Sequence, residues 1–188
     1  LIKLGNNWNL TNTDIGLISG AYFVGYVIAT PILVGLTDSI DAKKVFLGGC
    51  LVGILGNLGF FLFVNNFWTA LISWSIVGAG LAGTYMPGLQ ILNARLSSDV
   101  RIRAIPWYTS CFGIGTGLSF ALMGHLFIKY DFKIASLLGV FSSIISFLMV
   151  LSFVSNKRIE NTMSNFYRHP LDLRPAFKKP LTMSYILS

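Results

Sequence analysis

The side chains that could bind a solute lie in long stretches of sequence without a single acid or base. In the first stretch, polar residues recur at a spacing that places them on one face of a helix, at about 100° per residue: Ser19, Tyr22, Tyr26 and Thr30. Later stretches add a helix face with Trp74 and Tyr85, and another with Tyr108 and Ser119. Such groups can line a cavity for a solute, or they can pack against a neighbouring helix, and Trp74 also suits a membrane interface.

Catalytic chemistry finds no support in the sequence. It has no Gly-Lys-Ser/Thr phosphate loop, no cluster of metal ligands and no plausibly placed Ser/His/Asp set. The glycines at 113, 115 and 117 lie in an apolar stretch without a preceding strand, so they are not a dinucleotide fingerprint. We predict no metal, no cofactor and no enzyme, since an integral-membrane enzyme would need residues outside this chain. His125 is predicted to be an interfacial residue, and no charged residue lies near the centre of a predicted span to relay protons.

Membrane-spanning helices must position these residues. The 188 residues are 54% hydrophobic and 11% charged, and their mean hydropathy is +0.69, whereas a typical soluble domain is about 25% charged. Uncharged runs cover 15–37, 45–94, 104–128 and 134–156, and about 20 apolar residues cross a bilayer. We predict an all-α integral membrane protein with five complete transmembrane helices, at 15–36, 45–64, 67–93, 104–128 and 134–154. Pro106 is expected in the first turn of the fourth helix, where its missing N–H is tolerated.

The bases are divided unequally between the two sides of the predicted spans. Eleven Lys and Arg residues lie on one side, and three lie on the other: Lys3, Lys129 and Lys133. The positive-inside rule makes the richer side cytoplasmic, so the turn at 37–44, the loop at 95–103 and the linker at 155–180 are expected there. The net charge of +7 is thereby explained by topology, and we predict no nucleic-acid partner. An odd number of spans is expected ahead of the first one if the whole protein starts in the cytoplasm.

Small residues indicate a tight bundle. Pairs of glycines four residues apart allow helix backbones to approach closely, and we expect this of three pairs, with helices that slide or rock against each other: Gly16/Gly20, Gly49/Gly53 and Gly113/Gly117. Cys50 and Cys111 both lie in predicted spans, where we expect them to pack as small apolar residues.

The turn at 35–44 resembles the signature between the second and third helices of major facilitator superfamily (MFS) transporters. Matching residues are Gly35, Leu36, Asp38, Lys43 and Lys44, whereas Ser39 replaces the usual Arg and Asp41 replaces the usual second Gly. The third span is similar to the Arg-x-x-x-Gly-x-Gly of the family's fourth helix, with Trp74 at the Arg position. The Phe-Lys pair at 132–133 is similar to the Trp-Arg that begins the family's sixth helix.

The resemblance implies an architecture for the whole chain. Residues 1–154 would be the helical bundle of the N-terminal half of an MFS transporter, with family helices two to six. Residues 155–180 would be the cytoplasmic central loop, and 181–188 the truncated start of helix seven. The first helix and the C-terminal half of the same polypeptide would lie outside this sequence, and the substrate would bind between the halves near the midplane.

The resemblance also implies a function. We expect a secondary active or facilitative transporter that moves a small solute by alternating access. Its cavity would be lined by Ser19, Tyr22, Tyr26, Thr30, Trp74, Tyr85, Tyr108 and Ser119, and its cytoplasmic gate would contain Gly35, Asp38, Lys43 and Lys44.

An uncharged cavity favours a neutral or zwitterionic substrate, or one whose countercharge comes from residues outside this chain. Coupling to an ion would likewise require segments outside this chain or an ion other than the proton. The expected partners are the small-molecule substrate and the lipid bilayer, and the expected location is a bacterial inner membrane. The alternative is a transporter-like membrane receptor or scaffold without transport activity, which the altered residues Ser39, Asp41 and Trp74 favour.

Overall fold

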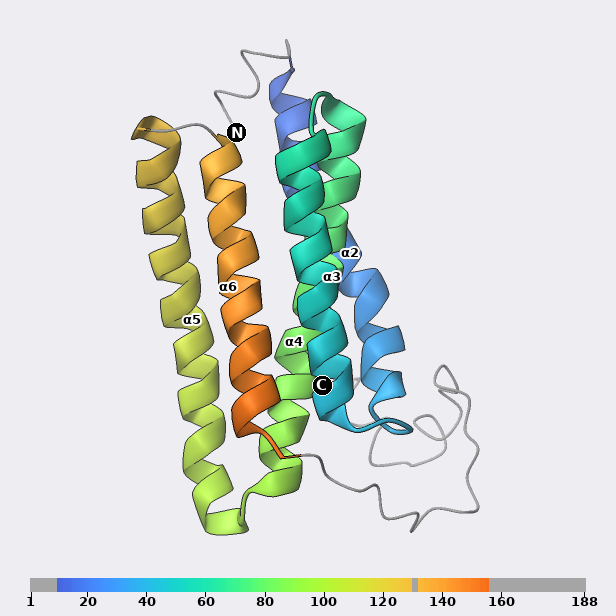
Figure 1. Cartoon of the computed structure of the whole chain (residues 1–188), viewed down its shortest axis with the longest axis vertical. Coiled ribbons are helices and arrows are strands. Elements are labelled where there is room, and N and C mark those ends of the chain that lie inside the picture. The colour runs from blue at the N-terminus through green and yellow to red at the C-terminus, as the bar shows by residue number, and fades with distance from the viewer. Residues whose placement is uncertain (1–9, 130–131, 156–188) are drawn as a thin grey trace, which may run out of the picture.

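The chain folds as a bundle of long helices in the computed structural model, which describes residues 10–129 and 132–155 (Figure 1). The helices are α2 (Asn12–Leu36), α3 (Ala42–Phe63), α4 (Phe67–Arg95), α5 (Ser98–Lys129) and α6 (Phe132–Phe153). All regular structure in these two ranges is helical, which confirms the all-α prediction. The linker predicted at 155–180, apart from Ser155, and the helix start predicted at 181–188 lie outside the described residues.

Side chains at the helix starts satisfy the first backbone N–H groups, which have no partner within the helix. The side chain of Thr11 accepts a hydrogen bond from the backbone N–H of Asp14, and the Asp14 carboxylate accepts one from the backbone N–H of Thr11. Asn66 and Thr69 form the same reciprocal arrangement at the start of α4. Asp41 caps α3 by accepting from the backbone N–H of Lys43 at 3.0 Å. These caps fix the residues at which α2, α3 and α4 begin.

The helix α5 begins earlier than the sequence predicts. It starts at Ser98, so Pro106 lies inside the helix and not in its first turn, and most of the expected charged loop is helical. Asp99 lies in the first turn, where an acidic side chain stabilises the positive end of the helix dipole. The sequence prediction began the helix after the charged stretch, whereas the helix includes that stretch from Ser98 onward.

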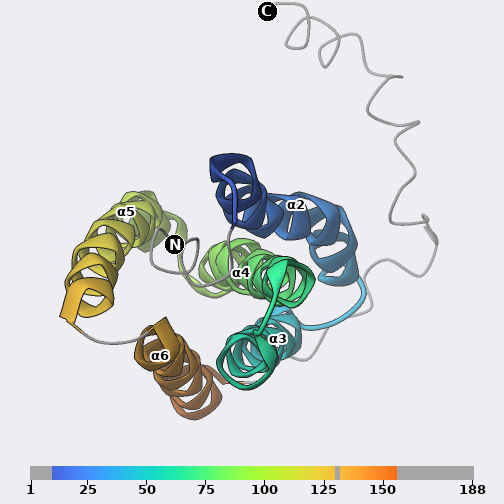
Figure 2. The same cartoon turned by 90° about the horizontal axis from the view of Figure 1, so that it is seen from above.

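The helix α4 lies at the centre of the described bundle. It packs against α2 on one side and against α3 on the other, and α6 packs against α3 (Figure 2). The contacts of α5 with α4 and α6 are much sparser. The described bundle is therefore a closely packed group of α2, α3, α4 and α6 with α5 at its side.

Glycines allow α3 and α4 to cross almost backbone to backbone. A Cβ atom added to Gly80 would lie 2.7 Å from the Cα of Gly53, and one added to Gly83 would lie 2.7 Å from the Cα of Gly49. Both distances are far below a van der Waals contact, so a side chain at either position would separate the helices. The predicted role of Gly49 and Gly53 is confirmed.

The other two predicted glycine pairs do not make such contacts. No described atom lies within 4 Å of a Cβ added to Gly16, Gly20, Gly113 or Gly117. Instead, α2 meets α4 through Gly25, which abuts the backbone of Ser75, and through Gly78, which abuts the backbone of Tyr22. The prediction for the two pairs is wrong within the described residues because their faces of α2 and α5 have no described helix against them.

Large apolar side chains cover the outer surface of the bundle. Exposed examples occur on every helix and include Phe23, Leu55, Trp68, Trp107 and Phe153. Four of the described helices are long and apolar enough to cross a membrane, and they are α2, α3, α4 and the part of α6 from Ser136 to Phe153. The more polar α5 is a helix of 32 residues but is not among these four.

Candidate functional site

An aromatic cluster joins α4 to α5. The ring centroids of Tyr85 and Tyr108 lie 5.8 Å apart with an interplanar angle of 24°, and the ring of Phe112 lies 4.6 Å from that of Tyr85 at 47°. The Tyr108 hydroxyl donates a hydrogen bond to the backbone carbonyl oxygen of Tyr85 at 3.0 Å. The structure thus brings together two of the predicted cavity residues, and it adds Phe112 and the α4 backbone to them.

The approach of α5 to α4 depends on Gly88. A Cβ atom at this position would lie 3.1 Å from Cζ of the Tyr108 ring and would collide with the Tyr108 hydroxyl. Gly88 is buried, although the Pro87-Gly88 pair lies inside a helix that continues to Arg95. Pro87 is itself fully buried, and the absence of a side chain at Gly88 leaves the space that the Tyr108 ring occupies.

A second aromatic group lies nearer to the start of α4. The ring centroids of Tyr22 and Trp74 are 5.9 Å apart, and those of Phe60 and Trp74 are 5.2 Å apart. Trp74 also packs against the buried cluster that contains Ile18 and Phe60. Trp74 therefore belongs largely to the packing between α2, α3 and α4, whereas Tyr22 is half-buried at its edge.

The hydroxyl residues of α2 satisfy their hydrogen bonds inside their own helix. The Ser19 hydroxyl donates to the carbonyl oxygen of Ile15 at 3.0 Å, and the Thr30 hydroxyl donates to that of Tyr26 at 2.7 Å. Ser19, Tyr26 and Thr30 are all half-buried. Back-bonding of this kind hides the polarity of a hydroxyl from an apolar environment and leaves few donors for a solute. Ser119 on α5 is exposed.

The residues of the predicted gate turn separate into two groups. Asp38 and Lys44 are exposed, and within the described residues the Asp38 carboxylate has no ion-pair partner. Lys43 is only 6% exposed, and its ammonium group donates to the carbonyl oxygen of Leu151 in α6 at 3.2 Å. Gly35 accepts a backbone hydrogen bond from Asp38 at 3.3 Å, which shapes the turn. Lys43 is thus held in place, whereas Asp38 and Lys44 are exposed side chains of the same turn.

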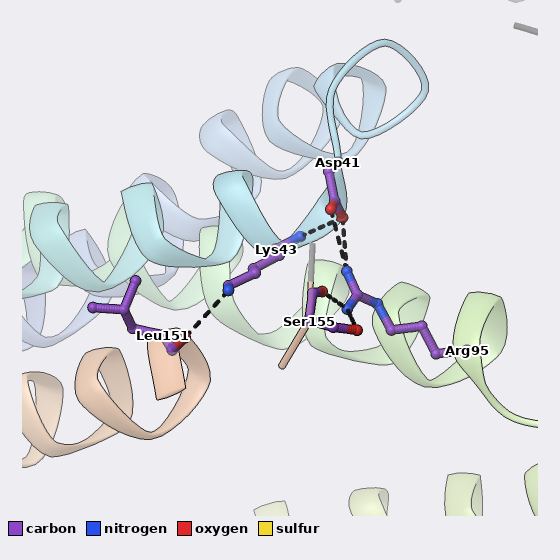
Figure 3. A network of polar contacts seen from close by, with 5 residues as sticks. All are labelled: Asp41, Lys43, Arg95, Leu151 and Ser155. Carbon is purple, nitrogen blue, oxygen red and sulfur yellow. Dashed lines mark hydrogen bonds and ion pairs between the residues drawn. The ribbon is translucent and has the colours of Figure 1, made fainter. Parts of the chain in front are cut away.

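An ion pair that sequence reasoning missed lies beside this turn. The Arg95 guanidinium contacts both carboxylate oxygens of Asp41, at 3.1 and 3.2 Å, and also donates to the carbonyl oxygen of Ser155 (Figure 3). The two charged side chains are 16% and 11% exposed. Arg95 had counted only toward topology, and Asp41 only as a departure from glycine. The sequence feature that could have indicated this ion pair is an acid at a helix start and a base at a helix end on the same predicted side of the membrane.

Two of these basic side chains converge on the end of α6. Lys43 from α3 and Arg95 from α4 donate to carbonyl oxygens at its C-terminal end, those of Leu151 and Ser155 (Figure 3). The last turn of α6 has no basic residue of its own. Because a helix C-terminus has unpaired carbonyl groups and a partial negative charge, cations from neighbouring helices are favourable there. The network therefore ties α3, α4 and α6 together at one end of the bundle.

These features define the class of protein as a multi-pass integral membrane protein, built from apolar helices with an uncharged aromatic surface and without any group of metal-binding side chains in the described ranges. The sequence profile of the Major Facilitator Superfamily matches residues 1–188. The chain belongs to this superfamily, whose members are transporters and not enzymes.

The curated relatives align with only part of this chain. A stretch of 148 residues, 75% of this chain, is 27% identical to the quinolone resistance protein NorA of Staphylococcus aureus and covers 37% of that protein. A stretch of 75 residues, 40% of this chain, is 36% identical to a probable sphingolipid transporter, spinster homolog 1 of Arabidopsis thaliana, and covers 15% of it. The chain therefore spans well under half the length of these relatives. No solved structure matches it significantly.

Proposed function

We propose that the protein is a secondary active or facilitative transporter that carries a small solute across the membrane by alternating access. Membership in the superfamily over the whole chain is the observation that carries this proposal. The described helices would form most of one half of the transporter, and the substrate would bind between this half and a second one. The location we propose is a bacterial inner membrane.

In this proposal α5 also crosses the membrane. Its 32 residues extend about 48 Å at ~1.5 Å per residue, which exceeds the roughly 30 Å of the hydrocarbon core. Residues 104–128 include no acid or base. A helix that lines a water-filled cavity on one side needs less hydropathy than one surrounded by lipid, and the exposed Gly, Ser and Thr residues of α5 agree with that position.

The cavity would be lined by α2, α4 and α5, and the gate would lie at the turn after α2. Tyr85 and Tyr108 are the cavity residues that the geometry supports best, because their rings meet at a surface between two helices. Tyr22, Tyr26, Ser19, Thr30 and Ser119 would contribute from half-buried or exposed positions, and Trp74 would act through packing. Asp38 and Lys44 would contact the other half of the transporter, while Lys43 holds the turn against α6.

Transport by the complete polypeptide in proteoliposomes tests this proposal. The probes are a quinolone and a sphingoid base, chosen because the relatives are a quinolone resistance protein and a probable sphingolipid transporter. We expect protein-dependent flux of at least one probe, reduced several-fold by Tyr85→Ala and little changed by Phe141→Ala on α6. Flux equal to that of protein-free liposomes for both probes and for a wider panel of small solutes would contradict a transport function.

A receptor or scaffold that retains the fold without transport is the second candidate. Ser39 is exposed beside an Asp38 without a described ion-pair partner, so the turn lacks the cation that the family pattern has there. Ser39→Arg separates the two functions. A change in flux in this variant supports a transporter with an altered gate, whereas absence of flux before and after the substitution supports a receptor or scaffold.

A further inference from the structure

The aromatic cluster of Tyr85, Tyr108 and Phe112 has the chemistry of a stacking surface. Tyr85 and Tyr108 are nearly parallel and half-buried, whereas Phe112 at the outer side of the cluster is 41% exposed. A further flat ring can extend this arrangement by offset or tilted stacking, the geometry that aromatic pairs prefer. A saturated ring of the same size has no π system with which to do so.

Hydrogen-bonding capacity in the cluster is small and localised. The Tyr108 hydroxyl donates to the Tyr85 carbonyl oxygen at 3.0 Å and is therefore not free to bind a solute. Among the described residues the Tyr85 hydroxyl has no hydrogen-bond partner, so it is the one donor that remains within the cluster. A polyol or sugar, which needs several donors and acceptors, would leave most of its hydroxyl groups unpaired here.

No acid or base belongs to the cluster. Tyr85 lies ten residues before Arg95 at the end of α4, about 15 Å along that helix, and Tyr108 lies five residues after Arg103, about 7.5 Å along α5. Arg103 is exposed and lies about 140° around α5 from Tyr108, so it is on another face of the helix. The cluster thus offers ring surfaces and one hydroxyl group on a face without an acid or base.

We propose that this cluster is the subsite that binds a planar, uncharged aromatic part of the transported solute, with the Tyr85 hydroxyl donating to one polar acceptor on that ring. Phe112 supplies the exposed stacking surface. Tyr108 positions Tyr85 and extends the stack, and Gly88 provides the space that lets the Tyr108 ring lie against α4. This subsite extends the proposed transport function, because it specifies the substrate class of the same cavity.

Binding to the complete polypeptide in lipid nanodiscs tests the subsite without requiring transport. The probes are coumarin, a flat neutral ring system with a lactone carbonyl, and octahydrocoumarin, its saturated counterpart. Saturation-transfer NMR, with empty nanodiscs subtracted to remove partition into lipid, measures the two dissociation constants. We expect coumarin to bind at least five-fold more tightly, and equal binding of the two probes to the unmodified protein would overturn the proposal.

Substitutions test whether the aromatic cluster causes the preference for coumarin over octahydrocoumarin. Phe112→Leu and Tyr108→Leu should reduce it to less than two-fold, whereas Tyr108→Phe should retain it because the ring remains. Tyr85→Phe should weaken coumarin several-fold through loss of the hydroxyl donor. Phe141→Leu on α6 is the matched control, since Phe141 is 59% exposed and lies outside the cluster, and it should change nothing. A preference for coumarin that survives in both Leu variants would place the ring elsewhere and overturn the proposal.

Failure of the subsite and failure of the transport function are distinguishable. Flux of any solute without a preference for coumarin removes the subsite alone. A ring preference that depends on Phe112, in a protein that shows no flux in proteoliposomes, supports the subsite while removing transport, and the ligand would then belong to a receptor.

Discussion

The ion pair between Asp41 and Arg95 should couple α3 to α4 in free energy as well as in geometry. Neutralising either side chain is the perturbation, with Asp41→Asn and Arg95→Gln as the substitutions. Asn keeps a side-chain oxygen and is as good a helix N-cap as Asp. The 3.0 Å hydrogen bond from the backbone N–H of Lys43 can therefore survive in the variant, so that the cycle isolates the charge.

The expected coupling energy of this ion pair follows from the distance between the two charges and from the burial of the two side chains. Unit charges 3.1 Å apart attract by about 5 kcal/mol at an effective dielectric constant near 20. Removing the two groups from water offsets most of this attraction. Exposed pairs contribute about 0.2–1 kcal/mol, and breaking a fully buried pair costs about 3–5 kcal/mol. With side chains 16% and 11% exposed, this pair lies between those limits, and we expect a coupling energy of about 1–3 kcal/mol.

Equilibrium unfolding of the complete protein in mixed detergent micelles measures this coupling through a double-mutant cycle. The two single variants and the double variant should be non-additive by the stated amount, and the coupling should weaken in high salt only modestly because the pair is largely buried. Asp38→Asn combined with Arg95→Gln is the control, since Asp38 is an exposed acid of the same turn. A coupling energy below about 0.5 kcal/mol for Asp41 with Arg95, or an equal one for Asp38, would refute this reasoning.

Two further predictions compare neighbouring residues that differ in environment. Gly49→Ala should destabilise the protein by about 1–3 kcal/mol in the same unfolding assay, because its Cβ would collide with the Gly83 backbone, whereas Gly48→Ala should be neutral or slightly stabilising. Equal effects would mean that the α3/α4 crossing is not close-packed. Lys43→Met should cost about 1–3 kcal/mol by leaving the Leu151 carbonyl oxygen without its ammonium donor, whereas Lys44→Met should stay within about 0.5 kcal/mol. A larger loss for Lys44 would contradict the assignment of Lys43 as the tether.

Helix existence could be predicted from the sequence, but helix ends and partners could not. Uncharged stretches of sufficient length defined five helices because a bilayer imposes a minimum apolar length. The start of α5 was misplaced because charge indicates where a span leaves the membrane, and Ser98 begins a helix that extends beyond that point. The same logic hid Arg95, whose charge was sufficiently explained by topology and whose ion pair required knowledge that the start of α3 lies beside the end of α4.

Lys43 and Lys44 show the limit of a motif. The sequence pattern assigned both lysines to one gate, and nothing in the residue types separates them. The helical turn that begins at Ala42 directs one into the interior against α6 and the other outward. Adjacent helical residues differ by about 100° in direction, so their roles depend on which neighbour occupies each side. The positions of those neighbours are given by the folded structure and not by the residue types in the motif.

The same limit applies at the candidate site, on the face of α4 that contains Trp74, Gly78 and Tyr85. The helical period correctly indicates that the three residues share a face, but the structure divides this face between two partners. At Trp74 and Gly78 it is covered by α2, with Gly78 against the Tyr22 backbone and Trp74 in the buried cluster. At Tyr85 it meets the aromatic rings of α5, of which Phe112 is 41% exposed. The ring-binding subsite is therefore proposed at Tyr85, beside the exposed Phe112, and not at Trp74, whose ring packs between helices.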